Sequence, residues 1–128
     1  NEGFILASQK TGTALSELVQ KTVHGYVKWF LNANLINKHR YKFFNVPAPC
    51  YRKAFALDAN QDAANVVRLF NETLKKNLER YSYDLIDVYG PTKAENSFSN
   101  GLYHCDNVHL DCSILNIIQD QIAQYDTL

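Results

Sequence analysis

Apolar residues recur every three or four positions over three segments of the chain, and this spacing predicts three amphipathic helices. The first covers about residues 13–34, and the second begins at Asp58, which has Gln61 at the spacing of a capping box. The third follows Asp111, whose side chain can cap its first turn. The apolar positions, in order, are Leu15, Leu18, Val19, Thr22, Val23, Tyr26, Val27, Phe30 and Leu31; Val67, Phe70, Leu74, Leu78 and Tyr81; Ile114, Leu115, Ile117, Ile118 and Ile122.

Two short apolar runs separate the helices and predict β-strands. The first, residues 41–46, ends at the prolines of "VPAP", and the second, "YDLIDVYG", ends at Gly90-Pro91. The polar stretch "PTKAENSFSNG" has no period and is expected to be an exposed loop. Because helices and strands alternate, we expect an α/β fold with three layers, α/β/α, around a short parallel sheet.

The predicted sheet is small for the helices that must cover it. Parallel sheets are normally larger and buried on both faces. Two strands therefore offer too little sheet surface to cover the apolar faces of three amphipathic helices. We therefore expect residues 1–128 to form a single domain or the C-terminal part of a larger one. The start, "NEGFILASQK", has the character of a cut or processed boundary, since the chain contains no Met.

Composition and charge argue against several classes of function. Lys+Arg and Asp+Glu both number 13, so the chain lacks the excess of basic residues that is typical of nucleic-acid-binding proteins. No run approaches the roughly 18 apolar residues of a membrane span. The three cysteines, Cys50, Cys105 and Cys112, are odd in number and form no CxxC pair, which indicates reduced thiols and a cytoplasmic location. The spacing of Cys105 and Cys112 still allows one disulfide.

The densest cluster of chemically active side chains is "GLYHCDNVHLD", residues 101–111. Asp106 and His109 are three residues apart, so a single turn of chain can bring them together. A histidine that acts as a general base needs a carboxylate on Nδ1 to fix its tautomer. The pair also follows a strand, and ligands of α/β sheets bind beyond the carboxyl ends of the strands. The simpler interpretation is a polar loop in which both side chains make local hydrogen bonds.

Two other chemical interpretations apply to this segment. Its residues of zinc-ligand type are His104, Cys105, Asp106, His109 and Cys112. They lie within nine residues with no second cluster elsewhere, so we expect neither a metal nor another cofactor. His109 could instead activate Cys105 or Cys50 as a nucleophile, although a small buried hydrophobe is the simpler role for Cys105.

Four segments, taken in order, resemble the C-terminal half of an SGNH (GDSL-type) hydrolase. They are "YKFFNVPAP", "DANQDAANVVRLFNETLKKNLERY", "YDLIDVYGP" and "GLYHCDNVHLD", and they cover roughly residues 40 to 125. In that family a strand with a V-P-A-P-like end precedes a helix containing "N..L". A strand with a D-V-like step, a long loop and D-x-x-H-L before the terminal helix follow. The ordered succession carries the resemblance, because each motif alone is degenerate.

The resemblance implies a flavodoxin-like SGNH topology and a serine esterase or lipase-like activity that uses a catalytic triad. Asp106 and His109 match the family's acid and base. The G-D-S block that carries the nucleophile, and the Gly and G-x-N-D-like blocks that help to form the oxyanion hole, are absent from this chain. We therefore expect hydrolysis of a small ester, or of an acylated carbohydrate or lipid, only when an N-terminal half completes the domain.

Other residues at the same carboxyl edge are candidates for substrate binding or for support. The candidates for substrate binding are Asn45, Val46, Pro47, Ala48 and Tyr103, with Pro49 and Phe98 beside them. Asp87 at the end of the second strand is a candidate for supporting the active-site loop. Each has a structural alternative: a turn for residues 45–49, anchoring of the loop for the aromatic residues, and a solvent-facing strand position for Asp87.

A non-catalytic α/β interaction module, or a partial-domain fragment, is the alternative to the hydrolase. A two-stranded sheet leaves edges that pair readily with other strands. In that interpretation the chain associates with a partner, or with itself as a homo-oligomer, through an exposed sheet edge.

Overall fold

The computed structural model describes residues 2–33 and 41–126, and most of these residues are helical. The elements, in chain order, are α1 (Glu2–Thr11), α2 (Leu15–Ala33), β1 (Lys42–Phe44), α3 (Leu57–Arg80), β2 (Asp84–Ile86), α4 (Tyr89–Thr92), the 3-10 helix η2 (Cys112–Ile114) and α5 (Leu115–Asp126). The two strands pair in parallel, so the predicted mixed α/β class is confirmed. Within the two described ranges, no helix combines the length and the apolar character needed to cross a membrane.

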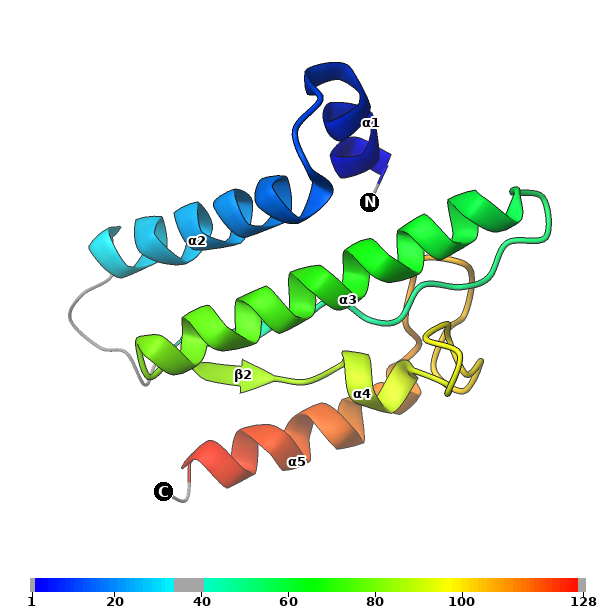
Figure 1. Ribbon diagram of the computed structural model, residues 1–128. Coiled ribbons are helices and arrows are strands. Elements are labelled where there is room, and N and C mark those ends of the chain that lie inside the picture. Colours follow the sequence, from blue (N-terminus) through cyan, green and yellow to red (C-terminus); the bar gives the residue numbers. More distant parts are fainter. Residues whose placement is uncertain (1, 34–40, 127–128) are drawn as a thin grey trace.

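The core lies between α2 and α3 and extends to the strands. Val19, Val23 and Val27 recur every four residues, so one stripe of α2 is fully buried. This stripe belongs to one apolar cluster with Leu74 and Leu78 of α3 and with Phe43 and Tyr83. Both predicted helices are therefore confirmed, although residue 34, the expected end of the first, lies outside the described residues. Figure 1 shows α2 and α3 stacked above β2, with α5 below it.

The outer edge of β2 is closed by side chains of α5. Alternate residues of a parallel strand direct their main-chain groups to opposite sides, and those of Leu85 and Asp87 point away from β1. The Tyr125 hydroxyl accepts from the Leu85 N–H at 3.2 Å and donates to the Leu85 carbonyl at 2.7 Å. Gln121 accepts from the Asp87 N–H at 2.7 Å and donates to the Asp87 carbonyl at 2.8 Å. These two side chains make the hydrogen bonds that a further strand would make.

The outer edge of β1 is marked by the direction of the main-chain groups of Phe44 and by the exposure of its side chain. The Asn45 N–H donates to the Ile86 carbonyl at 3.3 Å, so the main-chain groups of the preceding residue, Phe44, point away from β2. The Phe44 side chain is also 52% exposed. Of the two edges of the sheet, we therefore expect the β1 edge, and not the β2 edge, to associate with other strands.

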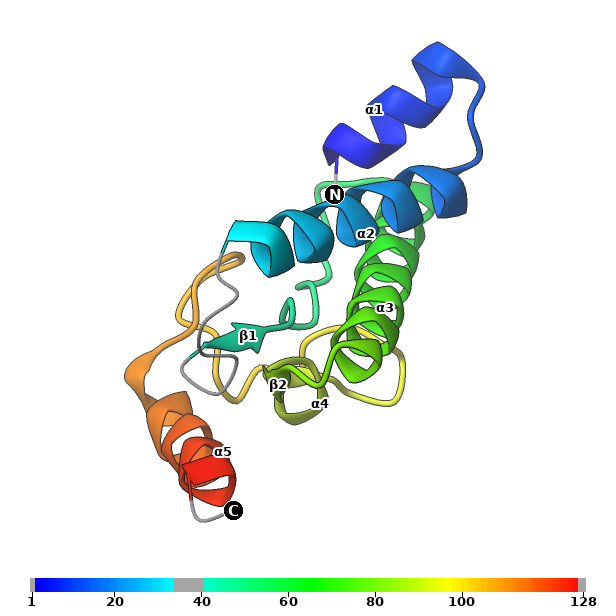
Figure 2. The same cartoon turned by 90° about the vertical axis from the view of Figure 1, so that its left-hand side faces the viewer.

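α1 is a helix that the sequence analysis does not predict. It ends at Thr11, and Gly12 follows in the left-handed region with φ +67°. The Gly12 N–H donates to the Ser8 carbonyl at 3.0 Å, which is the pattern of a glycine helix end. A glycine directly after the run "FILASQKT" is the signal that could have identified this helix. Figure 2 shows α1 above α2, with a short loop that joins the end of α1 to the start of α2.

The start of α3 differs from the predicted capping box. The helix begins at Leu57, and Ala56 at the N-cap position makes no side-chain capping bond. Asp58 lies in the first turn, where its negative charge is favourable against the helix dipole. The buried Asn60 organises this end instead, because its amide accepts from the Arg52 N–H and donates to the Arg52 carbonyl, both at 2.9 Å.

The end of the second strand and the following loop also differ from expectation. Gly90 and Pro91 lie within α4, where a proline in the first turn costs no helical hydrogen bond. Thr92 lies in the stretch predicted to be exposed, yet it is fully buried. Its hydroxyl accepts from the Ala48 N–H at 2.9 Å, which ties α4 to the segment after β1.

The last helix begins as predicted. The Asp111 side chain accepts from the Ser113 N–H at 2.8 Å at the start of η2, which leads directly into α5. Ile114 is buried, whereas no described residue of α5 itself is fully buried. α5 is bound to the β2 edge by the hydrogen bonds of Gln121 and Tyr125, and its residues Ile117, Ile118 and Ile122 are partly buried.

Candidate active site

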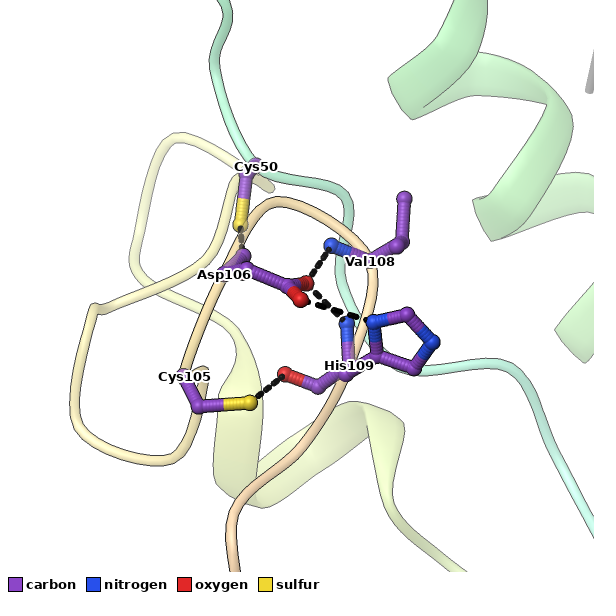
Figure 3. A network of polar contacts seen from close by, with 5 residues as sticks. All are labelled: Cys50, Cys105, Asp106, Val108 and His109. Atoms are coloured by element: carbon purple, nitrogen blue, oxygen red, sulfur yellow. Dashed lines mark hydrogen bonds and ion pairs between the residues drawn. The ribbon is translucent and has the colours of Figure 1, made fainter.

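Asp106 and His109 lie at the tip of a tight loop that precedes η2. An antiparallel bridge between His104 and Leu110 closes the base of this loop. The Cys105 N–H donates to the His109 carbonyl at 3.0 Å. The main chain therefore holds the two ends of the predicted motif together and turns Asp106 toward His109 (Figure 3).

The Asp106 carboxylate shapes this turn and orients the histidine. Its Oδ1 accepts from the N–H groups of Val108 and His109, each at 2.7 Å. Its Oδ2 lies 2.7 Å from Nδ1 of His109. Because an ionised carboxylate only accepts hydrogen bonds, Nδ1 carries the proton and Nε2 is left as the basic nitrogen. The His109 side chain is 72% exposed, and no hydrogen bond within the described part of the chain reaches Nε2.

These contacts lower the pKa of Asp106 from its ordinary 3.8 to about 2. The largest cause is the Val108 N–H, followed by the side-chain hydrogen bond with His109 and by the His109 N–H, all of which favour the ionised carboxylate. The folded-state pKa lies below the unfolded one, so the ionised carboxylate stabilises the fold above about pH 4. That contribution is lost as the pH falls through about 2.

A carbon NMR titration of the Asp106 carboxyl is expected to give a midpoint near pH 2. In His109→Ala the pKa of Asp106 should rise but stay below 3.8, because the Val108 N–H, its largest cause, is retained. Asp111 is the internal control, since its lowered pKa comes mainly from Ser113 and should not change in this variant. An Asp106 midpoint unchanged by His109→Ala would contradict the side-chain contact.

The segment after β1 is held near this loop by side chains of neighbouring elements. Asn71 of α3 is buried, and its amide accepts from the Val46 N–H at 2.8 Å and donates to the Val46 carbonyl at 2.7 Å. Asn71, the asparagine of the "N..L" pattern, therefore pairs with Val46 as a neighbouring strand would. At the end of the segment the Cys50 thiol approaches the Asp106 carbonyl at 3.8 Å (Figure 3).

A cavity of about 710 Å³ opens between α1, the segment after β1, α3 and the Asp106–His109 loop. Three of the predicted substrate-binding residues, Val46, Pro47 and Ala48, line it. The loop contributes Val108, which immediately precedes His109. The structure thus brings most of the predicted substrate segment and the acid–base loop to the same cavity.

Asn45 and Tyr103, the other two predicted substrate-binding residues, do not line this cavity. Asn45 Oδ1 accepts from the Val88 N–H at 2.8 Å, and its Nδ2 donates to Asp87 Oδ1 at 2.8 Å. Asn45 and Asp87 therefore join the carboxyl ends of the two strands. The Tyr103 carbonyl accepts from the Asp111 N–H at 2.7 Å, a contact that supports the loop.

Phe98 anchors the long loop, which is the structural alternative to substrate binding given above for the aromatic residues. Its ring meets the ring of Tyr51 edge-on, with centroids 5.3 Å apart. The contact joins the long loop to the segment after β1. Phe98 is also outside the residues that line the cavity.

The side chains considered as zinc ligands have separate partners. His104 Nδ1 lies 2.7 Å from Ser99 Oγ, and the Cys105 thiol faces the His109 carbonyl at 3.5 Å. Cys105 and Cys112 are both free thiols, so the disulfide that their spacing allows is not formed. Across residues 2–33 and 41–126, no group of three or more His, Cys, Asp or Glu side chains could hold a metal ion.

The serines of this chain do not provide a partner for His109. Within the described ranges, no hydrogen bond joins a serine to the His109 ring. Ser99 Oγ contacts His104 and accepts from the Gly101 N–H at 3.1 Å, so it belongs to the internal hydrogen bonds of the loop. Ser82 precedes β2, whereas His109 follows the carboxyl end of that strand.

Part of the cavity wall comes from residues that the sequence motifs do not connect with the site. Ile5 and Leu6 of α1 line the cavity, as do Ala63 and Val67 of α3. Val67 was predicted on the apolar face of its helix, but periodicity does not distinguish a core position from a cavity wall. Ile5 and Leu6 could have been considered only after the helix that ends at Gly12 had been recognised.

The Asp106–His109 pair is suited to proton transfer; the adjacent residues Asn107 and Val108 line the cavity, whereas the pair itself does not. Nδ1 of His109 is held by a carboxylate, and Nε2 faces outward where it could take a proton from a hydroxyl. The chain itself matches no protein-family model, no curated protein and no solved structure.

Proposed function

We propose that this chain is the C-terminal half of an SGNH-type serine ester hydrolase, with His109 as general base and Asp106 as its orienting carboxylate. The observation that carries the proposal is the 2.7 Å contact between His109 Nδ1 and Asp106 Oδ2, in a loop whose Val108 lines the same cavity as the segment after β1. The nucleophilic serine and the oxyanion donors belong to an N-terminal half. The substrate is a small ester, or an acylated carbohydrate or lipid.

In this proposal His109 moves one proton in each half of the reaction. Nε2 takes the proton of the serine hydroxyl as the oxygen attacks the ester carbonyl, and returns it to the departing alcohol. Nε2 then takes a proton from water, which attacks the acyl-enzyme, and returns it to the serine oxygen as the acid leaves. Asp106 stays ionised and stabilises the imidazolium that forms each time.

The finer fold of the proposal is a three-layer α/β/α domain with flavodoxin-like topology. Its support is the parallel pairing of β1 and β2, joined by α3, with α5 on the outer edge of β2. An N-terminal half would continue the sheet beside β1, where the main-chain groups of Phe44 point outward.

The gene is expected to encode a G-D-S block upstream of Asn1, and a fluorophosphonate should label the complete protein at that serine. Intact-mass and peptide mass spectrometry should find one label per complete molecule, because the probe reacts with an activated serine. The 128-residue chain alone is the matched control and should remain unlabelled. A label on a serine within residues 1–128 would contradict the proposal.

A non-catalytic interaction module is the second candidate, and the exposed Phe44 on the outer edge of β1 favours it. Such a module would pair with another strand, from a partner or from a second copy of the chain. An upstream sequence without a G-D-S block, together with a complete protein that resists fluorophosphonate, would select this candidate over the hydrolase.

A further inference from the structure

We infer that the cavity lined in part by Val108, the residue before His109, binds an aliphatic chain, so that the substrate is an ester with a chain of several carbons rather than an acetylated sugar. The inference rests on the proposed function for the position of the reacting carbonyl. Binding of the aliphatic chain itself needs only the cavity, so it can be tested without the nucleophile.

The wall of the cavity is mainly apolar and comes from four separate parts of the fold. Its apolar residues include Ile5, Leu6, Val46, Pro47, Val67 and Val108. Leu6 is 53% exposed and Val108 is 61% exposed. Large apolar side chains that gather around one concave surface indicate a binding site for an apolar ligand.

The wall also contains polar residues, and three of them have partners in the chain; the polar residues are Gln9, Arg52, Asp58, Asn60, Asp62, His104 and Asn107. The Asn60 amide is bonded to the main chain of Arg52, and His104 Nδ1 lies against Ser99 Oγ. The Arg52 guanidinium lies over the Phe55 ring, 5.2 Å from its centroid. A sugar requires many hydrogen-bonding partners to replace water, whereas an aliphatic chain requires none.

The position of Val108 links the cavity to the proposed chemistry. Its N–H binds the Asp106 carboxylate, its side chain lines the cavity, and the next residue is His109. On the proposed function, a chain held in the cavity would extend toward the loop that carries His109, which itself is not among the residues that line the cavity. The volume of about 710 Å³ lies within the range of roughly 300–1,000 Å³ that is common for small-molecule sites.

The test is an NMR titration of the isotope-labelled 128-residue chain with methyl butyrate, methyl hexanoate and methyl octanoate. These esters are uncharged, so differences among them report the aliphatic chain alone. We expect the Kd to fall about fourfold for each CH₂ added, the value for burial of a methylene. The amides of Val46, Ala48, Val67 and Val108 should shift together, because these residues line the cavity.

Two substitutions in different walls, with one matched control, locate the site. Leu6→Asp and Val108→Asp should each raise the Kd for methyl octanoate by about tenfold or more, because each replaces an apolar side chain of the wall with a carboxylate. Leu102→Asp is the control, since Leu102 is 67% exposed but does not line the cavity. If circular dichroism shows that Leu6→Asp lowers the helix content, the Val108→Asp result decides.

The inference is overturned if the Kd does not depend on chain length, or if the shifts gather around Phe44 instead of the cavity. The proposed hydrolase fails by a different result, a complete protein that fluorophosphonate does not label. Because ester binding and serine labelling are measured separately, each proposal can fail alone.

Discussion

Replacing His109 with alanine in the complete protein is expected to lower ester turnover by about a millionfold, the loss seen when the base of a serine triad is removed. Without Nε2, nothing takes the serine proton during attack on the carbonyl. Steady-state hydrolysis of a chromogenic ester measures the loss. His24→Ala is the matched control, because His24 is also exposed but lies on α2, where its ring contacts Asn77.

Asp106→Asn separates the orienting role of this carboxylate from its role in the turn. An asparagine oxygen can still accept from the N–H groups of Val108 and His109, so the turn should be kept. Its amide group would face Nδ1 and favour the wrong tautomer, with an expected loss of about ten-thousandfold in turnover. Full activity in His109→Ala would end the assignment of the base, and full activity in Asp106→Asn would end that of the orienting carboxylate.

Asn71→Ala is expected to lower the free energy of unfolding by about 2–4 kcal/mol. The substitution removes the two hydrogen bonds that Asn71 makes to Val46 and leaves one donor and one acceptor of the main chain without them. It also opens space beside a segment that lines the cavity. Urea denaturation, with the slope held common to both proteins, measures the change.

Two further variants identify the cause of that loss. Asn65→Ala changes an exposed asparagine on the same helix and should stay within about 0.5 kcal/mol of the parent protein. Asn71→Asp keeps an acceptor for the Val46 N–H but faces the Val46 carbonyl with a second oxygen, so it should destabilise nearly as much as alanine. Equal stability for Asn71→Asp and the parent would show that the bond to the carbonyl is unimportant.

Much of the fold follows from periodicity alone. The valines of α2 and the leucines of α3 form a buried stripe that any amphipathic pattern would predict. The parallel sheet follows from a helix that connects two apolar runs. Periodicity does not predict α1, because its apolar residues are few and close together, and the clearest signal is Gly12 after its end. The start of α3 was misassigned because Asn60, not Asp58, organises it from within the helix.

In the candidate site, the sequence predicts contacts between residues close together in the chain but not contacts between distant ones. The contact of Asp106 with His109 could be predicted, because three residues of chain bring the two side chains together. The orientation of Asn45 could not, since it depends on Asp87 and Val88 from another strand. An asparagine in a sequence can have either of two roles. It can be buried and hydrogen-bond a main chain as a neighbouring strand would, as Asn71 does with Val46, or it can lie exposed in a turn.

The hydrogen bonds from α5 to β2 also limit how many molecules can join through the sheet. A sheet with two open edges can add partners on both sides and grow into a fibre, whereas a sheet with one open edge stops after a single addition. Gln121 and Tyr125 occupy one edge of the described sheet, so in both proposals a further strand would be added on the β1 side. Pairing through β1 therefore ends with a completed domain or a closed pair, and open-ended polymerisation would first require α5 to leave β2.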